Sequence, residues 1–85
     1  MNEVEATIDG NRVRGTHVDL GLVDALDANG EPYKAYKDRF TFGDKVVESE
    51  VDAELCKLDG NSASFRMAEA LAWLENAGIT ELEIV

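Results

Sequence analysis

The sequence predicts an α+β fold in which a four-stranded antiparallel meander is followed by one α-helix and a final β-strand, with the helix packed on one sheet face. Apolar and polar residues alternate through much of residues 3–55, residues 62–77 are rich in Ala, Leu, Met and Glu, and alternation returns in residues 79–85. Because 85 residues are too few for two cores, residues 1–85 are expected to form a single small acidic domain.

The first two strands are expected to form a hairpin. Residues 3–8 alternate between polar and apolar, and Asp9-Gly10 is a pair typical of a two-residue type I′ turn. Such a turn places Glu5 opposite Arg14. Further along the second strand the apolar residues change phase, which predicts a β-bulge near Gly15.

The third and fourth strands, Tyr33 to Phe42 and Lys45 to Leu55, are expected to pair around a turn at Gly43-Asp44. This turn predicts the facing pairs Phe40 with Val47, Tyr36 with Val51, Arg39 with Glu48, Lys37 with Glu50, Ala35 with Asp52 and Tyr33 with Glu54. The alternation of the fourth strand predicts an inward row of Val47, Ser49, Val51, Ala53 and Leu55, and an outward row of Glu48, Glu50, Asp52 and Glu54.

Residues Ser62 to Ala77 are expected to form a helix of about four turns. Asn61, Ser62 or Ser64 is available as the N-cap, and Gly78 suits the C-terminal end. The apolar face is expected to contain Phe65, Met67, Ala68, Leu71 and Leu74, with Trp73 as a further candidate. The last strand, residues 79–85, is expected to pair in parallel with a meander strand, because the helix carries the chain back across the sheet.

The charge balance restricts the partners. With 18 acidic and 8 basic residues, the chain has a formal net charge of −10, which repels nucleic acid and anionic membrane surfaces. No apolar run is long enough to span a membrane, and the first residues lack the pattern of a signal peptide. We therefore expect a cytoplasmic protein whose charged partner is basic.

Candidate catalytic groups are few. His17 is the only histidine and has no neighbouring Cys or Ser that suggests a nucleophile and its base. The segment Asp27 to Gly30 lacks two of the ligands that a calcium loop requires, and no glycine-rich phosphate-binding motif is present. Cys56 is the single cysteine, so the chain cannot form an internal disulfide. The sequence predicts no enzyme activity, no cofactor and no metal site.

The acidic residues are concentrated on outward strand positions, which predicts a carboxylate face. Such a face would steer a basic partner toward the protein. The residues expected to bind that partner are Glu48, Glu50, Asp52, Glu54, Glu81 and Glu83. Two alternatives remain open: Arg14, Lys37 and Arg39 neutralise the acids and leave an ordinary solvated sheet face, or the acids serve solubility alone.

Four short segments of the chain carry a resemblance to a known family. They are Thr7-Ile8-Asp9-Gly10 with the later Gly21, Asp27-Ala28-Asn29-Gly30, Ala53-Glu54-Leu55 and Ala77 to Ile84, and together they resemble the front half of a ribonuclease H domain. That family holds two metal ions with three carboxylates, one on the first strand, one on the helix and one after the fourth strand. The resemblance implies that Asp9 matches the first carboxylate and Glu54 the second, and that the third carboxylate has no counterpart in this sequence. Small antitoxins of the HicB type are similar in using a truncated fold of this kind.

The function expected from these patterns is that of a non-enzymatic acidic protein-binding module, which occludes a basic surface on a nuclease, a toxin or a nucleic-acid-binding complex. A phage-encoded inhibitor of a defence system, such as an anti-CRISPR protein, or an antitoxin would have this size and charge. One alternative is a truncated ribonuclease H-like domain, catalytically incomplete or weakly metal-dependent. Another is a structural subunit that self-associates through a strand edge or helix face.

Overall fold

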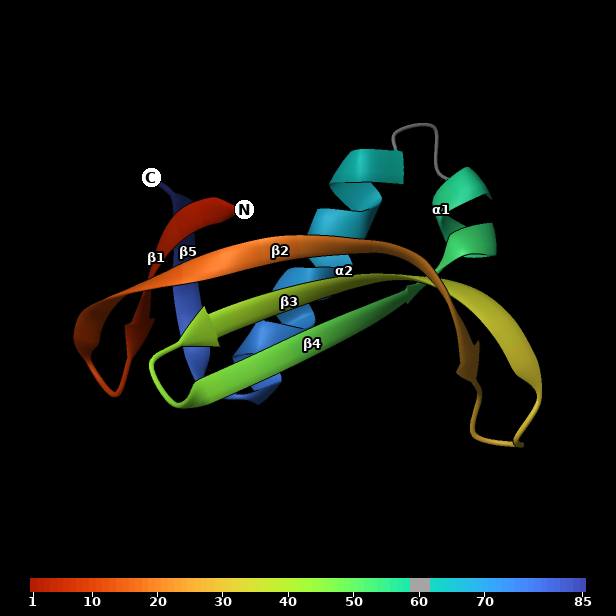
Figure 1. Cartoon of the computed structure of the whole chain (residues 1–85), viewed down its shortest axis with the longest axis horizontal. Coiled ribbons are helices and arrows are strands. Elements are labelled where there is room, and N and C mark those ends of the chain that lie inside the picture. Colours follow the sequence, from red (N-terminus) through yellow and green to blue (C-terminus); the bar gives the residue numbers. More distant parts are fainter. Residues whose placement is uncertain (59–61) are drawn as a thin grey trace.

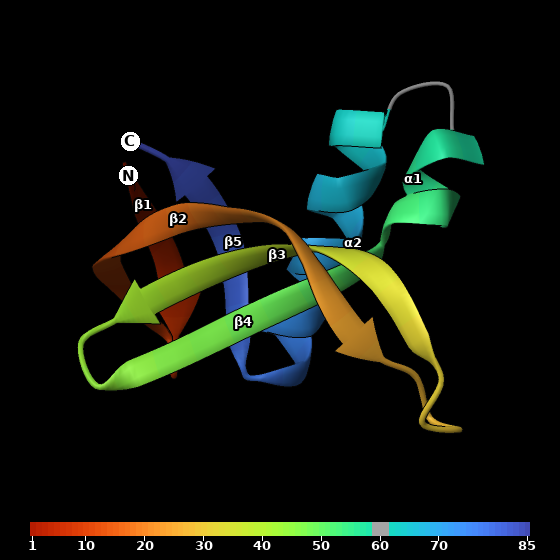
Figure 2. The same cartoon turned by 45° about the vertical axis from the view of Figure 1, so that its right-hand side comes forward.

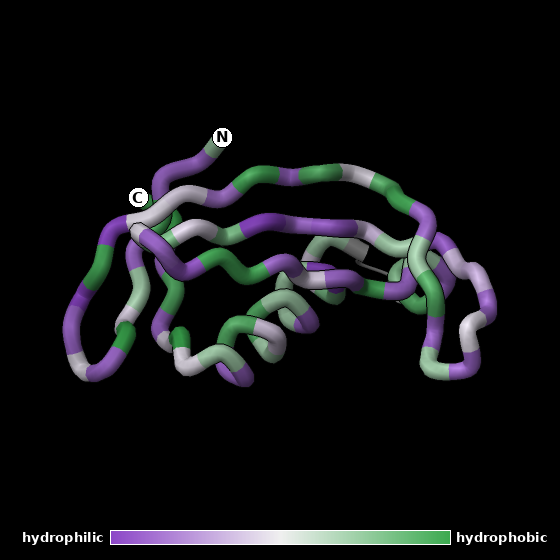
Figure 3. Tube along the Cα trace, turned by 60° about the horizontal axis from the view of Figure 1, so that its bottom comes forward, coloured by the Kyte–Doolittle hydropathy of each residue, from purple (hydrophilic) through white to green (hydrophobic). Residues whose placement is uncertain are grey.

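The structure, a computed structural model, describes residues 1–58 and 62–85. Its elements are β1 (Asn2–Ile8), β2 (Asn11–Leu26), β3 (Pro32–Phe42), β4 (Lys45–Asp52), α1 (Ala53–Leu58), α2 (Ser62–Asn76) and β5 (Ile79–Ile84). The fold is α+β, as predicted, with a five-stranded antiparallel sheet in the order β4-β3-β2-β1-β5. The strands arch over α2, which packs against their concave side, and the convex side faces solvent (Figures 1 and 3).

The predicted registers of both hairpins are confirmed. Glu5 faces Arg14 across β1 and β2, and the turn between these strands has positive φ at Asp9 (52°) and Gly10 (80°), as a type I′ turn requires. Between β3 and β4 the observed pairs include Phe40 with Val47, Tyr36 with Val51, Arg39 with Glu48, Lys37 with Glu50 and Ala35 with Asp52. The short turns therefore determined which side chains of these four strands share a face.

The predicted bulge near Gly15 is wrong in position. Gly15 lies in regular register opposite Val4, and the register shifts between Asp19 and Gly21 instead. Gly21 has a φ of 75°, and its amide donates a 2.7 Å hydrogen bond to Asp19 Oδ1, which stabilises the irregular backbone there. Gly15 serves close packing, because a Cβ at this position would lie 2.3 Å from the Thr41 carbonyl oxygen.

The fourth strand is shorter than predicted. It ends at Asp52, and residues 53–58 form the helix α1, so Glu54 does not face Tyr33 and Leu55 is 50% exposed rather than buried. Asp52 explains the change, because its Oδ1 accepts a 2.8 Å hydrogen bond from the Glu54 amide in the first turn of α1. An aspartate in that position caps a helix and competes with continuation of the strand.

The last strand runs antiparallel to β1, so the predicted parallel pairing is wrong. Helix α2 delivers the chain to the C-terminal end of β1, where Gly78 reverses it with a φ of 81° and Ile79 pairs with Ile8. A strand that starts there can pair with β1 only in the opposite direction (Figure 2). The Val85 amide donates a 3.0 Å hydrogen bond to the Glu3 carbonyl oxygen, which places the two ends of the chain together.

The core lies between α2 and the concave face of the sheet. It comprises Val4, Ala6, Phe40, Phe42, Ala70, Leu74 and Ile79. On α2, Leu74 is buried as predicted, whereas Ala68, Leu71 and Trp73 are exposed and Ala70 takes the central position. The small Ala70 side chain permits close approach of the helix to the strands. The N-cap candidate Asn61 lies outside the described residues.

Candidate functional site

The convex face of the sheet carries ion pairs between neighbouring strands. On β3 and β4, Arg39 Nε lies 2.7 Å from Glu48 Oε2, and Lys37 Nζ lies 3.2 Å from Glu48 and 3.5 Å from Glu50. The Arg39 and Lys37 hydrogen bonds lower the pKa of Glu48, and the hydrogen bond to Glu48 raises the pKa of Lys37. These contacts neutralise much of the acidic row on β4.

A second group of ion pairs lies on β1, β2 and β5. Arg12 lies 3.6 Å from Glu5 and 3.5 Å from Glu83, and Arg14 lies 3.6 Å from Glu3. Arg12 Nη1 also donates a 2.8 Å hydrogen bond to the carbonyl oxygen of Glu81, a residue with a φ of 53°. The guanidinium of Arg12 thus links β5 to the hairpin at an irregular point of the sheet.

The six predicted partner-binding acids do not form one patch. Glu48, Glu50 and Asp52 lie on β4 and Glu54 follows on α1, whereas Glu81 and Glu83 lie on β5. Because β4 and β5 occupy opposite edges of the sheet, three strands separate the two groups. The group on β4 and α1 therefore constitutes one candidate surface by itself.

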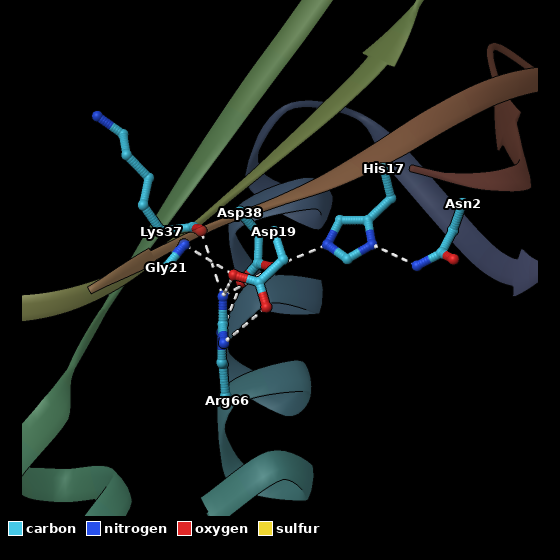
Figure 4. A network of polar contacts seen from close by, with 7 residues as sticks. All are labelled: Asn2, His17, Asp19, Gly21, Lys37, Asp38 and Arg66. Carbon is cyan, nitrogen blue, oxygen red and sulfur yellow. Dashed lines mark hydrogen bonds and ion pairs between the residues drawn. The ribbon is translucent and has the colours of Figure 1, made fainter. Parts of the chain in front are cut away.

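A partly buried polar network, which the sequence interpretation missed, connects the concave face to α2 (Figure 4). Arg66 donates to both oxygens of Asp38, from Nε at 2.8 Å and from Nη2 at 3.1 Å, and to Asp19 Oδ1 at 2.7 Å. The Asp38 side chain is only 6% exposed. Burial of the guanidinium opposes its charge, but the hydrogen bonds to Asp19 and Asp38 prevail and raise the pKa of Arg66, while the bond from Arg66 lowers the pKa of Asp19.

His17 belongs to the same network and has a structural role. Its Nε2 lies 2.7 Å from Asp38 Oδ1, its Nδ1 lies 3.3 Å from the amide nitrogen of Asn2, and its ring stacks on Phe40 at 4.7 Å. Both ring nitrogens are therefore engaged with side chains of the protein itself, which leaves neither for a substrate.

Two hollows border these elements. A groove of about 330 Å³ lies between α2 and β5 and is lined by Leu71, Glu75, Ile79, Thr80, Glu81 and Leu82. A smaller one of about 190 Å³ lies beside the polar network and is lined by His17, Asp19, Asp38, Ala63, Arg66 and Met67. The first combines apolar side chains with two exposed carboxylates, whereas the polar groups beside the second already bond one another.

The carboxylates assigned through the ribonuclease H resemblance do not converge. Asp9 lies in the turn between β1 and β2 and Glu54 lies on α1, and these segments are at opposite ends of the molecule (Figures 1 and 2). Within residues 1–58 and 62–85, no group of three or more His, Cys, Asp or Glu side chains is placed to hold a metal ion. No helix in these ranges has both the length and the apolar character needed to cross a membrane.

The basic side chains are almost all engaged. Seven of the eight lie within ion-pair distance of a carboxylate, and Lys45 is the exception among the described contacts. Several acids remain exposed with no ion pair in the described part of the chain, among them Asp9, Glu31, Glu69, Glu75 and Glu81. The protein thus presents surplus negative charge and very little positive charge that is free to meet a phosphate backbone.

Comparison with known proteins identifies no relative. No family model matches the chain, and neither a curated protein nor a solved structure matches it. The geometry of its own side chains and strand edges is therefore the basis on which a function is proposed.

Proposed function

We propose that this chain is a non-enzymatic acidic protein-binding module that occludes a basic surface of another protein. The observation that carries the proposal is the imbalance of exposed charge: seven of the eight basic side chains lie within ion-pair distance of the chain's own carboxylates, and the excess acids face solvent. A surface of this kind attracts basic partners over a distance of about 8 Å at physiological ionic strength.

Surfaces that bind nucleic acid are a natural class of partner. They are rich in Lys and Arg, and a net charge of −10 complements them without imitating a duplex. A protein that covers such a surface would inhibit the partner. A phage-encoded anti-defence protein would act in this way on a nuclease, and an antitoxin would act in this way on a toxin that binds nucleic acid. The polar network supports this role by fixing α2 to the sheet, which keeps the acidic surface in one shape.

The test measures association of the protein with an immobilised octalysine peptide and with a 12-base-pair DNA duplex, by surface plasmon resonance over a salt series. Association with the peptide is expected to slow as salt rises, because screening weakens the attraction between opposite charges. The duplex is expected not to bind, because its phosphates and the protein carry charge of the same sign. Absence of peptide binding at low salt, or peptide binding indifferent to salt, contradicts the proposal.

Charge reversal distinguishes a local surface from overall charge. The double variant Glu50→Lys with Glu54→Lys changes the β4 and α1 surface, and Glu31→Lys with Glu69→Lys makes the same charge change elsewhere. The first pair of substitutions is expected to slow association with octalysine more than the second. Glu50 and Glu54 belong to one surface with Glu48 and Asp52, whereas Glu31 and Glu69 lie elsewhere, and charges that lie together steer the encounter most strongly. Asp52 is left unchanged, because its carboxylate caps α1 and its reversal would disturb folding as well.

A further inference from the structure

Among the residues that the structure describes, no strand pairs with the outer edge of β4, and this edge has regular geometry. β4 is the terminal strand of the sheet, and its eight residues pair with β3 without a register shift. The other terminal strand, β5, is irregular: its pairing with β1 shifts between Glu5 and Thr7, and Glu81 adopts a φ of 53°. Irregularities of this kind protect an edge against added strands, and β4 lacks them.

The backbone amides and carbonyls of β4 that point away from β3, toward the open edge of the sheet, belong to the even-numbered residues of the strand. These are called its outward backbone groups. Phe42 and Lys45 flank the two-residue turn and form the first hydrogen-bonded pair with β3, so the pairs of Val47, Ser49 and Val51 are also hydrogen-bonded. The amides and carbonyls of the residues between them point away from β3. Those residues are Val46, Glu48, Glu50 and Asp52, so three of the four outward-facing backbone positions carry a carboxylate.

This coincidence disfavours a second copy of the chain at the edge. An antiparallel pairing of two β4 strands centred on residue 48, 49 or 50 sets Glu48 against itself, Glu48 against Glu50, or Glu50 against itself. Like charges directly opposite one another destabilise a strand pair, whereas opposite charges stabilise it. The structure already shows the favourable case along the edge of β4 that pairs with β3, where Lys37 and Arg39 face Glu50 and Glu48.

We propose that the basic partner contributes an extended segment that adds to the free edge of β4 as an antiparallel strand. Its Lys or Arg residues occupy alternate positions, opposite Glu48 and Glu50, and its backbone bonds the amides and carbonyls of residues 46–50 that point away from β3. The acidic row then lies between two basic rows. This inference rests on the proposed function and specifies how the partner is held.

The test compares three peptides of six residues with alternating Lys and Val. The first is unmodified, the second is N-methylated at the Lys amides and the third is N-methylated at the Val amides, so all have the same charge. Only the Lys amides face β4 when Lys lies opposite the acids, because directly opposed residues of a hydrogen-bonded pair exchange both bonds. Methylation at Lys is expected to weaken binding by about ten-fold or more, and methylation at Val to leave it nearly unchanged.

Binding is followed by NMR titration of the isotopically labelled full chain, with shifts expected at the amides of residues 46–52 and not on β5. Val46→Pro removes one outward amide without a change of charge and is expected to weaken binding of the unmodified peptide about five-fold relative to its control Val46→Thr. Equal, salt-sensitive binding of all three peptides overturns the edge inference and leaves the proposed function intact. No binding of any peptide at low salt overturns both.

Discussion

Arg66 of α2 and Asp38 of β3 form a two-pronged ion pair, with Nε and Nη2 at 2.8 and 3.1 Å from the two carboxylate oxygens. The same guanidinium lies 4.8 Å above the ring of Tyr36. The helix is therefore fixed to the sheet by a charged contact beside its apolar core, and the orientation of α2 depends on both.

Arg66→Met is expected to destabilise the fold by about 3–5 kcal/mol, because it leaves the buried carboxylate of Asp38 without its cation. Arg66→Lys is expected to lose less, since it retains the charge and loses the two-pronged geometry. The free energy of unfolding in urea measures both. Lys57→Met removes the exposed pair with Glu54 and serves as the control, with an expected loss below about 0.5 kcal/mol. Equal losses for Met at 66 and at 57 would show that the buried pair has no special weight.

Ser49→Ala is expected to raise the free energy of unfolding by about 1 kcal/mol. Ser49 is fully buried, and its hydroxyl has no hydrogen-bond partner among the described residues. An unsatisfied buried hydroxyl loses its bonds to water on folding, and alanine avoids this loss with little change in volume. The urea midpoint provides the measurement. A lower midpoint in the variant would indicate that the hydroxyl has a partner in solution.

Gly15→Ala is expected to destabilise the protein by about 2–3 kcal/mol, because the new methyl group would collide with the Thr41 carbonyl and the Phe42 ring. Gly10→Ala is the matched comparison. At Gly10 nothing lies within 4 Å of the added Cβ, and the cost of about 1 kcal/mol comes from the φ of 80° alone. Thermal unfolding of the two variants would contradict this account if Gly10→Ala proved the more damaging.

Stability is expected to fall in acid. Hydrogen bonds from Arg66 lower the pKa of Asp19 below its ordinary 3.8, and those from Arg39 and Lys37 lower the pKa of Glu48 below 4.5. A carboxyl with a lowered folded-state pKa contributes fully above its ordinary pKa, and the contribution disappears as pH falls through the folded value. Urea midpoints between pH 7 and pH 3 should therefore decline below about pH 4.5, and less steeply in Glu48→Gln. An identical decline in the variant would exclude Glu48 as a contributor.

The sequence predicted the parts of the fold that depend on short turns. Asp9-Gly10 and Gly43-Asp44 each fixed a hairpin and its register, because a two-residue turn permits one alignment of its strands. The sequence did not predict the end of β4, because Asp52 continues the polar alternation of the strand and also caps a helix. The local pattern does not distinguish continuation of a strand from the start of a helix at this residue. The direction of β5 depended on where α2 ends in space, which is a property of tertiary packing.

The candidate site was also predicted only in part, because the sequence pattern indicates local register but not long-range contacts. The acids of β4 were placed correctly beside Lys37 and Arg39, but the distance between them and Glu81 depends on a strand order that no local pattern specifies. The network of Arg66 was missed because its members are 28 and 47 residues apart in the chain. A signal was present in Asp38, a charged residue at an inward position between Tyr36 and Phe40, since a buried charge requires a partner.

The hydrogen bond between Val85 and Glu3 has a practical consequence for experiments on this protein. It holds both chain ends beside β1 and β5, across the full width of the sheet from β4. An affinity tag or a surface tether attached at either end therefore leaves the β4 edge accessible. A short linker that joins the ends would also permit circular permutation, with new ends opened in the exposed turn at Gly30, and the permuted protein would present the same binding edge from a different anchor point.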